Sequence, residues 1–169
     1  MAKVAVRRFD GGDWRLYRAL RLRSLREAPD VFGSTFKREA GLSDADWRSR
    51  LEKASPSLDL PLVAEREGKP VGLAWGKVFP GEKDRAYLFQ MWVAAEFRGQ
   101  GIGRRLLQYV LSWAADLRVE WVELTVMIGN APATRLYHDL GFRPEGDLEP
   151  LREGSDQRVQ RLCLPLGNP

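Results

Sequence analysis

The segment Val93-Ala-Ala-Glu-Phe-Arg-Gly-Gln-Gly-Ile-Gly-Arg-Arg105 is the most informative stretch of the chain. Glycines alternate within it at positions 99, 101 and 103. An apolar stretch, Tyr87–Val93, precedes it, and apolar residues with helical spacing follow it at 102, 106, 107, 110, 111 and 114. This order predicts a strand, a glycine-rich loop and a helix. Because glycine has no Cβ, the backbone N–H groups of such a loop can approach a ligand closely.

The start of the helix after the loop is suited to an anion. A helix N-terminus offers unpaired N–H groups and a partial positive charge. Arg104 and Arg105 occupy its first turn, although acidic residues are preferred there and each cation costs about 0.3–1 kcal/mol. A bound anion would offset that cost, so the segment predicts a phosphate-binding site.

The glycines also allow other interpretations. The spacing of a P-loop, Gly-x-x-x-x-Gly-Lys-Ser/Thr, is absent. A dinucleotide-binding loop needs a third glycine where this chain has Arg104, although Glu120 lies at about the right distance for a ribose contact. A glycine-rich turn with a purely structural role is a further interpretation.

Composition narrows the class of protein. The chain has 169 residues, 44% of them hydrophobic and 30% charged, which is typical of one globular domain spanning residues 1–169. Its net charge of +4 fits an anionic ligand, nucleic acid or simply an arginine-rich proteome. One cysteine and one histidine argue against a disulfide framework and a metal site. With no secretory leader and no long apolar run, we expect a cytoplasmic protein without metal or membrane.

Hydrophobic periodicity predicts an α/β (α+β) fold without internal repeats or linkers. Strands are expected over residues 4–9, 60–65, 71–79, 85–93, 121–127, 142–145 and 158–166. Helices are expected over residues 14–28, from 44 onward, over 102–117 and over 133–140. The first half of the sheet should be mostly antiparallel, and the helix after the glycine loop should be a crossover between strands.

Two motifs, which occur in the same order along the chain as in a known family, carry a resemblance to that family. The first is Arg98-Gly-Gln-Gly-Ile-Gly103 after a strand, and the second is Asn130-Ala-Pro-Ala-Thr-Arg-Leu-Tyr-His-Asp-Leu-Gly-Phe142. In both, the chain resembles the GNAT superfamily of acetyl-CoA-dependent N-acetyltransferases, over about residues 58–166. The resemblance implies a GNAT-like fold, in which a mixed central sheet of about six to seven strands is flanked by about four helices.

The resemblance also implies how acetyl-CoA would be held as co-substrate. Backbone amides of the glycine loop would bind the pyrophosphate, and main-chain groups of the preceding strand would pair with the pantetheine arm where two parallel strands separate. Asn130 would contact the pantetheine or its phosphate end, and Tyr137 would lie near the thioester sulfur. The residues implied to bind acetyl-CoA are Met91, Val93, Arg98, Gly99, Gln100, Gly101, Ile102, Gly103, Arg104, Asn130, Ala133 and Tyr137.

Acetyl transfer to an amine needs positioning, a polarised carbonyl and control of protons. At pH 7 only about one part in 10³ of a lysine-like amine is neutral, so a base or a water chain must take its proton. The leaving thiolate needs a proton or a hydrogen bond, which a tyrosine hydroxyl can supply. We therefore expect Tyr137 to be the general acid; packing on the sheet is the alternative.

The general base is harder to identify. Many relatives carry a carboxylate on the strand before the glycine loop, but Tyr87–Val93 contains no acid. Gln90 can orient a water molecule but cannot take a proton. Glu123 on the neighbouring strand is the nearest candidate base, and water alone is the alternative. Weaker candidates are Glu39, Asp44 and Glu82.

The acceptor site is predicted from the segment between the first two helices, which walls the acceptor pocket in relatives. Phe32, Ser34, Thr35 and also Gln90 are expected to contact the substrate, and a packed interhelical turn is the alternative for the first three. Cys163 alternates with apolar residues in the last strand and should be packed. His138 lies about 100° around the helix from Tyr137 and should face the surface.

Taken together, the sequence predicts one domain that transfers acetyl from acetyl-CoA to a primary amine by direct attack in a ternary complex. A non-catalytic acyl-CoA-binding regulatory module on the same fold is the main alternative, supported by the missing strand carboxylate. A nucleic-acid-binding domain is supported only by net charge and is not expected. A homodimer is allowed for, since dimers are common in the resembling family.

Overall fold

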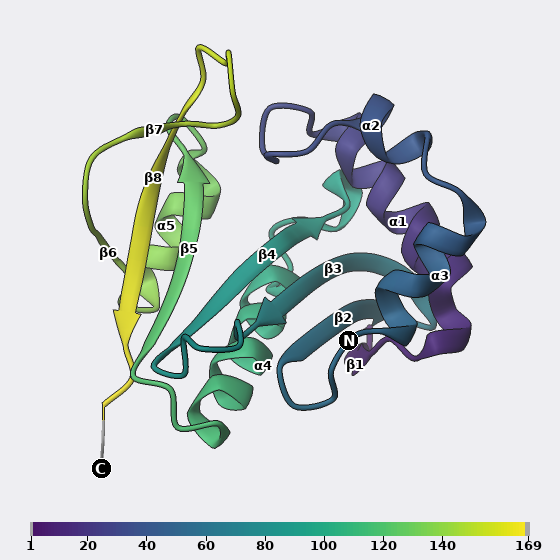
Figure 1. The fold of residues 1–169 in the computed structure, drawn as a ribbon, viewed down its shortest axis with the longest axis horizontal. Helices are drawn as coiled ribbons and strands as arrows, with labels where there is room; N and C mark the ends of the chain where they lie inside the picture. The colour runs from purple at the N-terminus through teal and green to yellow at the C-terminus, as the bar shows by residue number, and fades with distance from the viewer. Residues whose placement is uncertain (1, 168–169) are drawn as a thin grey trace.

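The computed structural model describes residues 2–167 as an α/β protein built on one mixed, eight-stranded sheet (Figure 1). The strand order is β1-β2-β3-β4-β5-β8-β6, and β7 also pairs with β8. All pairings are antiparallel except β4 with β5. The strands are β1 Val4–Arg8, β2 Asp59–Arg66, β3 Lys69–Lys77, β4 Arg85–Val93, β5 Trp121–Met127, β6 Arg143–Pro144, β7 Glu149–Pro150 and β8 Arg158–Pro165. This is the fold class that the sequence predicts.

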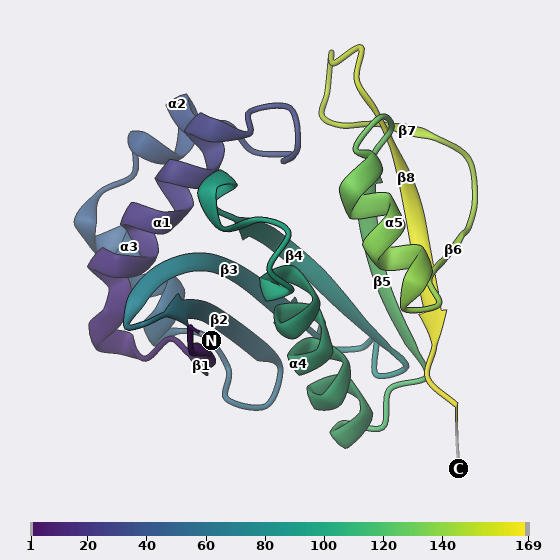
Figure 2. The same cartoon turned by 180° about the vertical axis from the view of Figure 1, so that it is seen from behind.

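Helices cover the two faces of the sheet unequally. The α-helices are α1 Trp14–Glu27, α2 Phe36–Ala40, α3 Asp44–Glu52, α4 Ile102–Asp116 and α5 Ala131–Asp139, with short 3-10 turns at Gly11–Asp13 and Ala95–Phe97. In Figure 2, α4 and α5 lie in front of the sheet, whereas α1, α2 and α3 form a group on the other side, in which α1 contacts β3 and β4. In Figure 1, the face of β4, β5 and β8 turned to the viewer carries no helix. We call this uncovered area the open face.

Helix α4 holds its place through an apolar stripe that the sequence pattern predicts. Ile102, Leu106, Leu107, Val110 and Ala114 are buried against the sheet. Burying each of the larger side chains stabilises the fold by about 1.5–3 kcal/mol. The helix approaches β3 so closely that a Cβ added at position 76, a glycine, would lie 2.9 Å from the ring of Trp113.

Strands β4 and β5 pair over only three residues, which opens the sheet. Parallel pairing runs from Arg85 with Trp121 to Tyr87 with Glu123. Beyond that point both strands continue, but the two backbones are no longer paired. Strand β4 is also bulged against β3, between the partners of Leu73 and Trp75, and there Gln90 adopts a left-handed backbone with φ +57°. The unpaired edges of β4 and β5 are therefore available to a ligand.

Two short elements were not predicted. Helix α2 has five residues, too few to show a helical period, and it is started by the hydroxyl of Thr35, which accepts from the Arg38 N–H at 3.2 Å. Strand β7 has two residues inside a segment that the sequence suggests is a loop. Within residues 2–167, the structure has no helix that is both long enough and apolar enough to span a bilayer.

Candidate acetyl-CoA site

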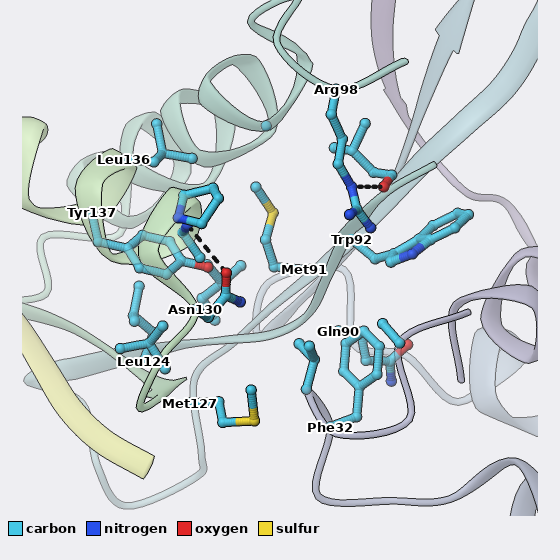
Figure 3. A pocket seen from close by; sticks show the side chains of 18 of the residues that line it. Phe32, Gln90, Met91, Trp92, Arg98, Leu124, Met127, Asn130, Leu136 and Tyr137 are labelled. Carbon is cyan, nitrogen blue, oxygen red and sulfur yellow. Dashed lines mark hydrogen bonds between the residues drawn. The ribbon is translucent and has the colours of Figure 1, made fainter. Parts of the chain in front are cut away.

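A cleft of about 770 Å³ lies where β4 and β5 separate. It is lined by the second half of β4, the glycine loop, the end of β5, the start of α5 and the loop between α1 and α2. Figure 3 shows Met91 and Tyr137 facing one another from β4 and α5. Of the residues predicted to bind acetyl-CoA or acceptor, the cleft brings together Phe32, Gln90, Met91, Val93, Arg98, Gly99, Gly101, Ile102, Gly103, Arg104, Asn130, Ala133 and Tyr137.

One end of the cleft is a backbone cradle for an anion. In the described part of the chain, no acceptor is hydrogen-bonded to the backbone N–H groups of residues 99–104. Gly99 and Gly101 have φ values of +74° and +79°, a left-handed conformation that other residues rarely adopt. Gly101 is the N-cap of α4, and the first turn of α4 contains no acidic residue. The loop can therefore hold a doubly charged phosphate group with main-chain donors alone.

The middle of the cleft carries the two polar side chains of the second motif. Asn130 is the N-cap of α5, and its Oδ1 accepts from the Ala133 N–H at 3.4 Å. Tyr137 is 6% exposed and packs edge-to-face on Phe142 with ring centroids 5.9 Å apart. Burial raises the pKa of Tyr137 to about 12. Its hydroxyl has no hydrogen-bond partner among the described residues, and it remains a proton donor at neutral pH.

Gln90 is held from the α1 side of the sheet. The fully buried hydroxyl of Tyr17 donates to its Oε1 at 2.8 Å. This contact fixes the side-chain amide at the bulged residue of β4, where the left-handed backbone costs about 1–3 kcal/mol. The sequence did not indicate this role for Tyr17, because Tyr17 lies 73 residues from Gln90 and resembles any other aromatic residue in a helix.

The candidate bases do not line the cleft. Glu123 lies where β4 and β5 are still paired, and its carboxylate binds Arg85 at 2.5 Å and Arg161 at 3.6 Å. Glu39 is buried between Arg21 and Arg50; burial disfavours its charged form, but hydrogen bonds from both arginines and the charge of Arg21 outweigh this and lower its pKa. Glu123, the base candidate expected from the sequence, is thus paired with two arginines and lies outside the cleft lining.

The remaining weak candidates are also engaged elsewhere. Glu82 accepts from the Tyr87 hydroxyl at 2.5 Å, and exposed Asp44 pairs with Arg18. The cleft lining contains one carboxylate, that of Glu27, which is paired with Arg23 at 2.7 Å. Of the alternatives that the sequence leaves for the base, only water remains compatible with this lining.

Only some of the residues predicted to contact the acceptor line the cleft. Phe32 lines the cleft, but Ser34 and Thr35 do not, and the Thr35 hydroxyl caps α2. Gln100 belongs to the glycine loop, yet it does not line the cleft either. The lining includes apolar residues that the sequence analysis does not single out, because they come from three separate segments: Val31, Phe89, Leu124, Val126 and Met127.

Cys163 and His138 behave as the sequence predicts. Cys163 is buried in β8, and burial raises the pKa of its thiol to about 12, which leaves it unreactive at neutral pH. His138 is exposed on α5. In residues 2–167, no three His, Cys, Asp or Glu side chains are grouped so that they could hold a metal ion.

Comparison with known proteins identifies the family. Residues 21–142 match the model of the acetyltransferase (GNAT) family, so the chain belongs to this family. An L-2,4-diaminobutyric acid acetyltransferase from Virgibacillus pantothenticus is 32% identical over 88 residues, covering 52% of this chain and 54% of that protein. An L-amino acid N-acetyltransferase from Escherichia coli is 27% identical over 148 residues, covering 86% of each chain.

A solved structure agrees with the family assignment. An acetyltransferase from Salmonella typhimurium, determined with its cofactor acetyl-CoA, has a TM-score of 0.79 and 19% identity, covering 98% of this chain and 95% of that chain. At this identity the match shows the fold alone. The chain spans about half the length of the first curated relatives it matches, 54% of one and 46% of another.

Proposed function

We propose that this chain is an N-acetyltransferase that transfers acetyl from acetyl-CoA to a primary amine by direct attack in a ternary complex. One observation carries the proposal. The opening between β4 and β5 joins a cradle of unpartnered backbone N–H groups at residues 99–104 to a buried, protonated tyrosine hydroxyl at Tyr137. Acetyl-CoA has a pyrophosphate at one end and a thioester at the other, separated by an arm that can pair with exposed strand edges.

The residues of the chain fit the co-substrate from end to end. Backbone donors of the loop and the charges of Arg98 and Arg104 would bind the pyrophosphate. Main-chain groups of Met91 and Val93 would pair with the pantetheine arm; at present the Val93 carbonyl accepts from Arg98 Nε at 3.0 Å. The amide nitrogen of Asn130 is free to contact the same arm, since its Oδ1 is used at the helix start.

Tyr137 would assist departure of the thiolate by hydrogen bonding. With a pKa of about 12, it is a weaker acid than an ordinary thiol of pKa about 8.5. Complete proton transfer to the thiolate would be unfavourable by roughly 5 kcal/mol at 1.36 kcal/mol per pKa unit. A hydrogen bond that strengthens as charge develops on sulfur stabilises the transition state without that penalty. The proton lost by the attacking amine can then neutralise the thiolate.

The amine would lose its proton to water. No unpaired carboxylate lines the described cleft, and Gln90, fixed by Tyr17, can orient a water molecule beside the attacking nitrogen. The rate should therefore rise with pH as the neutral fraction of the acceptor increases. The related proteins are named for amino-acid substrates, which are primary amines, and this agrees with the reaction class.

The decisive experiment measures acceptor-dependent release of CoA thiol from acetyl-CoA over a broad panel of primary amines, with mass spectrometry of the products. An N-acetylated product formed in step with CoA supports the proposal. Binding of acetyl-CoA without any acceptor-dependent release would instead support the non-catalytic CoA-binding module, and the transferase proposal would be abandoned. A cytoplasmic location and a homodimer remain predictions.

A further inference from the structure

Three aromatic rings stand together on the open face of the sheet. Phe79 follows β3, and Tyr87 and Phe89 lie on β4. The rings of Tyr87 and Phe89 are stacked, with centroids 6.1 Å apart and planes inclined by 14°. Phe79 packs edge-on to both, at 5.3 Å and 6.3 Å. We call Phe79, Tyr87 and Phe89 the aromatic shelf.

The shelf is exposed although its residues favour burial. Phe79 is 36% exposed and Phe89 is 42% exposed, and among residues 2–167 they are two of five large apolar side chains exposed to this degree. The shelf is also held in place, because the Tyr87 hydroxyl donates to Glu82 and the rings pack on one another. A fixed, exposed cluster of aromatic rings is typical of a binding surface.

The shelf is continuous with the cleft. Phe89 lines the cleft and directly precedes Gln90 in β4. Tyr87 pairs with Glu123 at the last residue before β4 and β5 separate. Ala86 and Leu88 pack in the cluster that contains α4, so the alternating Tyr87 and Phe89 side chains point to the opposite, open face. The shelf therefore begins where the opening between the strands begins. Phe89 therefore belongs both to the shelf and to the cleft lining.

The charged residues of the cleft limit which acceptors its acceptor end can bind. The charged residues in the lining are Glu27, Arg98 and Arg104. Both arginines belong to the phosphate end, and Glu27 is paired with Arg23. The acceptor end of the described lining therefore offers no free cation for a carboxylate and no free carboxylate for a second ammonium group. At the shelf, the Lys77 ammonium lies 5.3 Å from the Phe79 ring centroid, but it is paired with Asp59 at 2.9 Å.

We propose that the aromatic shelf binds the apolar part of the acceptor, so that the preferred substrates are primary amines with an aromatic group and no carboxylate. This inference rests on the proposed N-acetyltransferase function. In the reaction, the amine nitrogen forms a bond to the acetyl carbon, the carbon–sulfur bond breaks, and the proton lost by the nitrogen is transferred through water to the sulfur, so that CoA leaves as thiol. The ring of the acceptor lies against Phe79 and Phe89 while its nitrogen reaches the opening beside Gln90.

The first arm of the test compares 2-phenylethylamine with two other amines. 2-Phenylethylamine has the ring and no carboxylate, phenylalanine adds the carboxylate, and spermidine replaces the ring with further ammonium groups. We expect kcat/KM for 2-phenylethylamine to exceed both others by about tenfold or more, the effect of one well-made apolar contact. A preference for phenylalanine or spermidine would overturn the inference and leave the proposed function intact.

The second arm tests the shelf itself. Phe79→Ser should raise KM for 2-phenylethylamine about tenfold. The matched control is Tyr109→Ser on α4, which removes another ring that is 42% exposed and should leave that KM unchanged. Saturation-transfer NMR of 2-phenylethylamine with the CoA-bound protein should lose ring signals in the same variant, which gives a readout independent of turnover.

Each remaining outcome has a definite meaning. A change of KM below twofold in Phe79→Ser overturns the inference. A shift from dimer to monomer in Phe79→Ser with KM retained also overturns it, because a second copy of the chain would then cover the shelf. If no amine in the panel supports CoA release, the proposed function fails, and this result differs from acetylation of other amines, which removes only the inference.

Discussion

The two ends of the cleft are built by different means. At the proposed phosphate end, the backbone of one continuous segment, residues 99–104, would supply the hydrogen-bond donors. At the acceptor end, side chains meet from the α1–α2 loop, from β4 and from β5. The first end depends on local conformation and the second on the assembly of the whole fold. Substitutions should therefore act sharply and locally at the phosphate end and more gradually at the acceptor end.

Gly101→Glu should have the largest effect. It places a β-carbon at φ +79° and a negative charge within the proposed phosphate cradle. We expect acetyl-CoA affinity to fall by more than about 100-fold, which removes on the order of 2.7 kcal/mol of ligand stabilisation at saturating concentrations. Thermal unfolding with and without acetyl-CoA measures this loss.

A matched control separates the charge from the strain. Gly68→Glu introduces the same residue at φ +78° in the β2–β3 turn, where a Cβ would also meet no atom within 4 Å. Without ligand, the Gly68→Glu protein should lose about as much stability as the Gly101→Glu protein does. Acetyl-CoA should still stabilise Gly68→Glu. If Gly101→Glu retains that stabilisation as well, the loop is not the cofactor site and the contrast between the two ends is lost.

Tyr137→Phe should have the second-largest effect. Tyr137 lies between the phosphate end and the acceptor end of the cleft. It removes one hydroxyl and retains the ring that packs on Phe142. We expect kcat to fall about 100-fold with KM for acetyl-CoA nearly constant, since the lost hydrogen bond forms mainly in the transition state. Tyr109→Phe, the same chemical change on the exposed side of α4, should leave kcat unaltered.

The pH profile gives an independent test of Tyr137. Because burial raises its pKa to about 12, the hydroxyl stays protonated as pH rises through the ordinary tyrosine range near 10. The turnover rate of the unaltered protein should therefore show no alkaline decline below about pH 11. A decline centred between pH 9 and 10 that disappears in Tyr137→Phe would show that the hydroxyl titrates normally and is not buried during turnover.

The contrast between the ends also explains how far the sequence could be interpreted. The glycine loop, α4 and α5 were predictable because their signals lie within single segments: alternating glycines, a 3.6-residue apolar period and the continuous motif from Asn130 to Phe142. The bulge at Gln90, and the hydrogen bond from Tyr17 to the Gln90 side chain, could not be predicted. A left-handed residue inside a strand does not change the apolar pattern of the sequence. Phe89 is one more alternating strand residue in the sequence, and only the position of the strand opening gives it a possible role.

Tyr17→Phe should have a smaller effect, at the acceptor end. The ring keeps its packing, but the Oε1 of Gln90 loses its donor at the strained bulge. We expect kcat/KM for the acceptor to fall about tenfold, and stability to fall by about 0.5–1.5 kcal/mol. Steady-state kinetics should show KM for the acceptor changing more than KM for acetyl-CoA, a difference that general destabilisation would not produce.

A double-mutant cycle shows whether Tyr17 acts through Gln90. In Gln90→Met the partner of the hydroxyl is absent, so adding Tyr17→Phe should change acceptor kcat/KM much less than it does alone. Effects that simply add would mean that Tyr17 does not position Gln90. The backbone strain at the bulge would then be maintained by the surrounding strands alone.

Glu123→Gln should have the smallest effect on turnover. Glu123 is the carboxylate nearest to the strand opening in sequence terms, but its side chain binds Arg85 and Arg161 below the point where the strands separate. We expect kcat to stay within about twofold at every pH, and the free energy of unfolding to fall by about 0.5–2 kcal/mol because the ion pairs with Arg85 and Arg161 are both lost. Turnover slowed by about 100-fold or more, with the pH dependence of a lost base, would instead identify Glu123 as the general base. The acceptor end would then extend beyond the cleft to the paired part of β4 and β5.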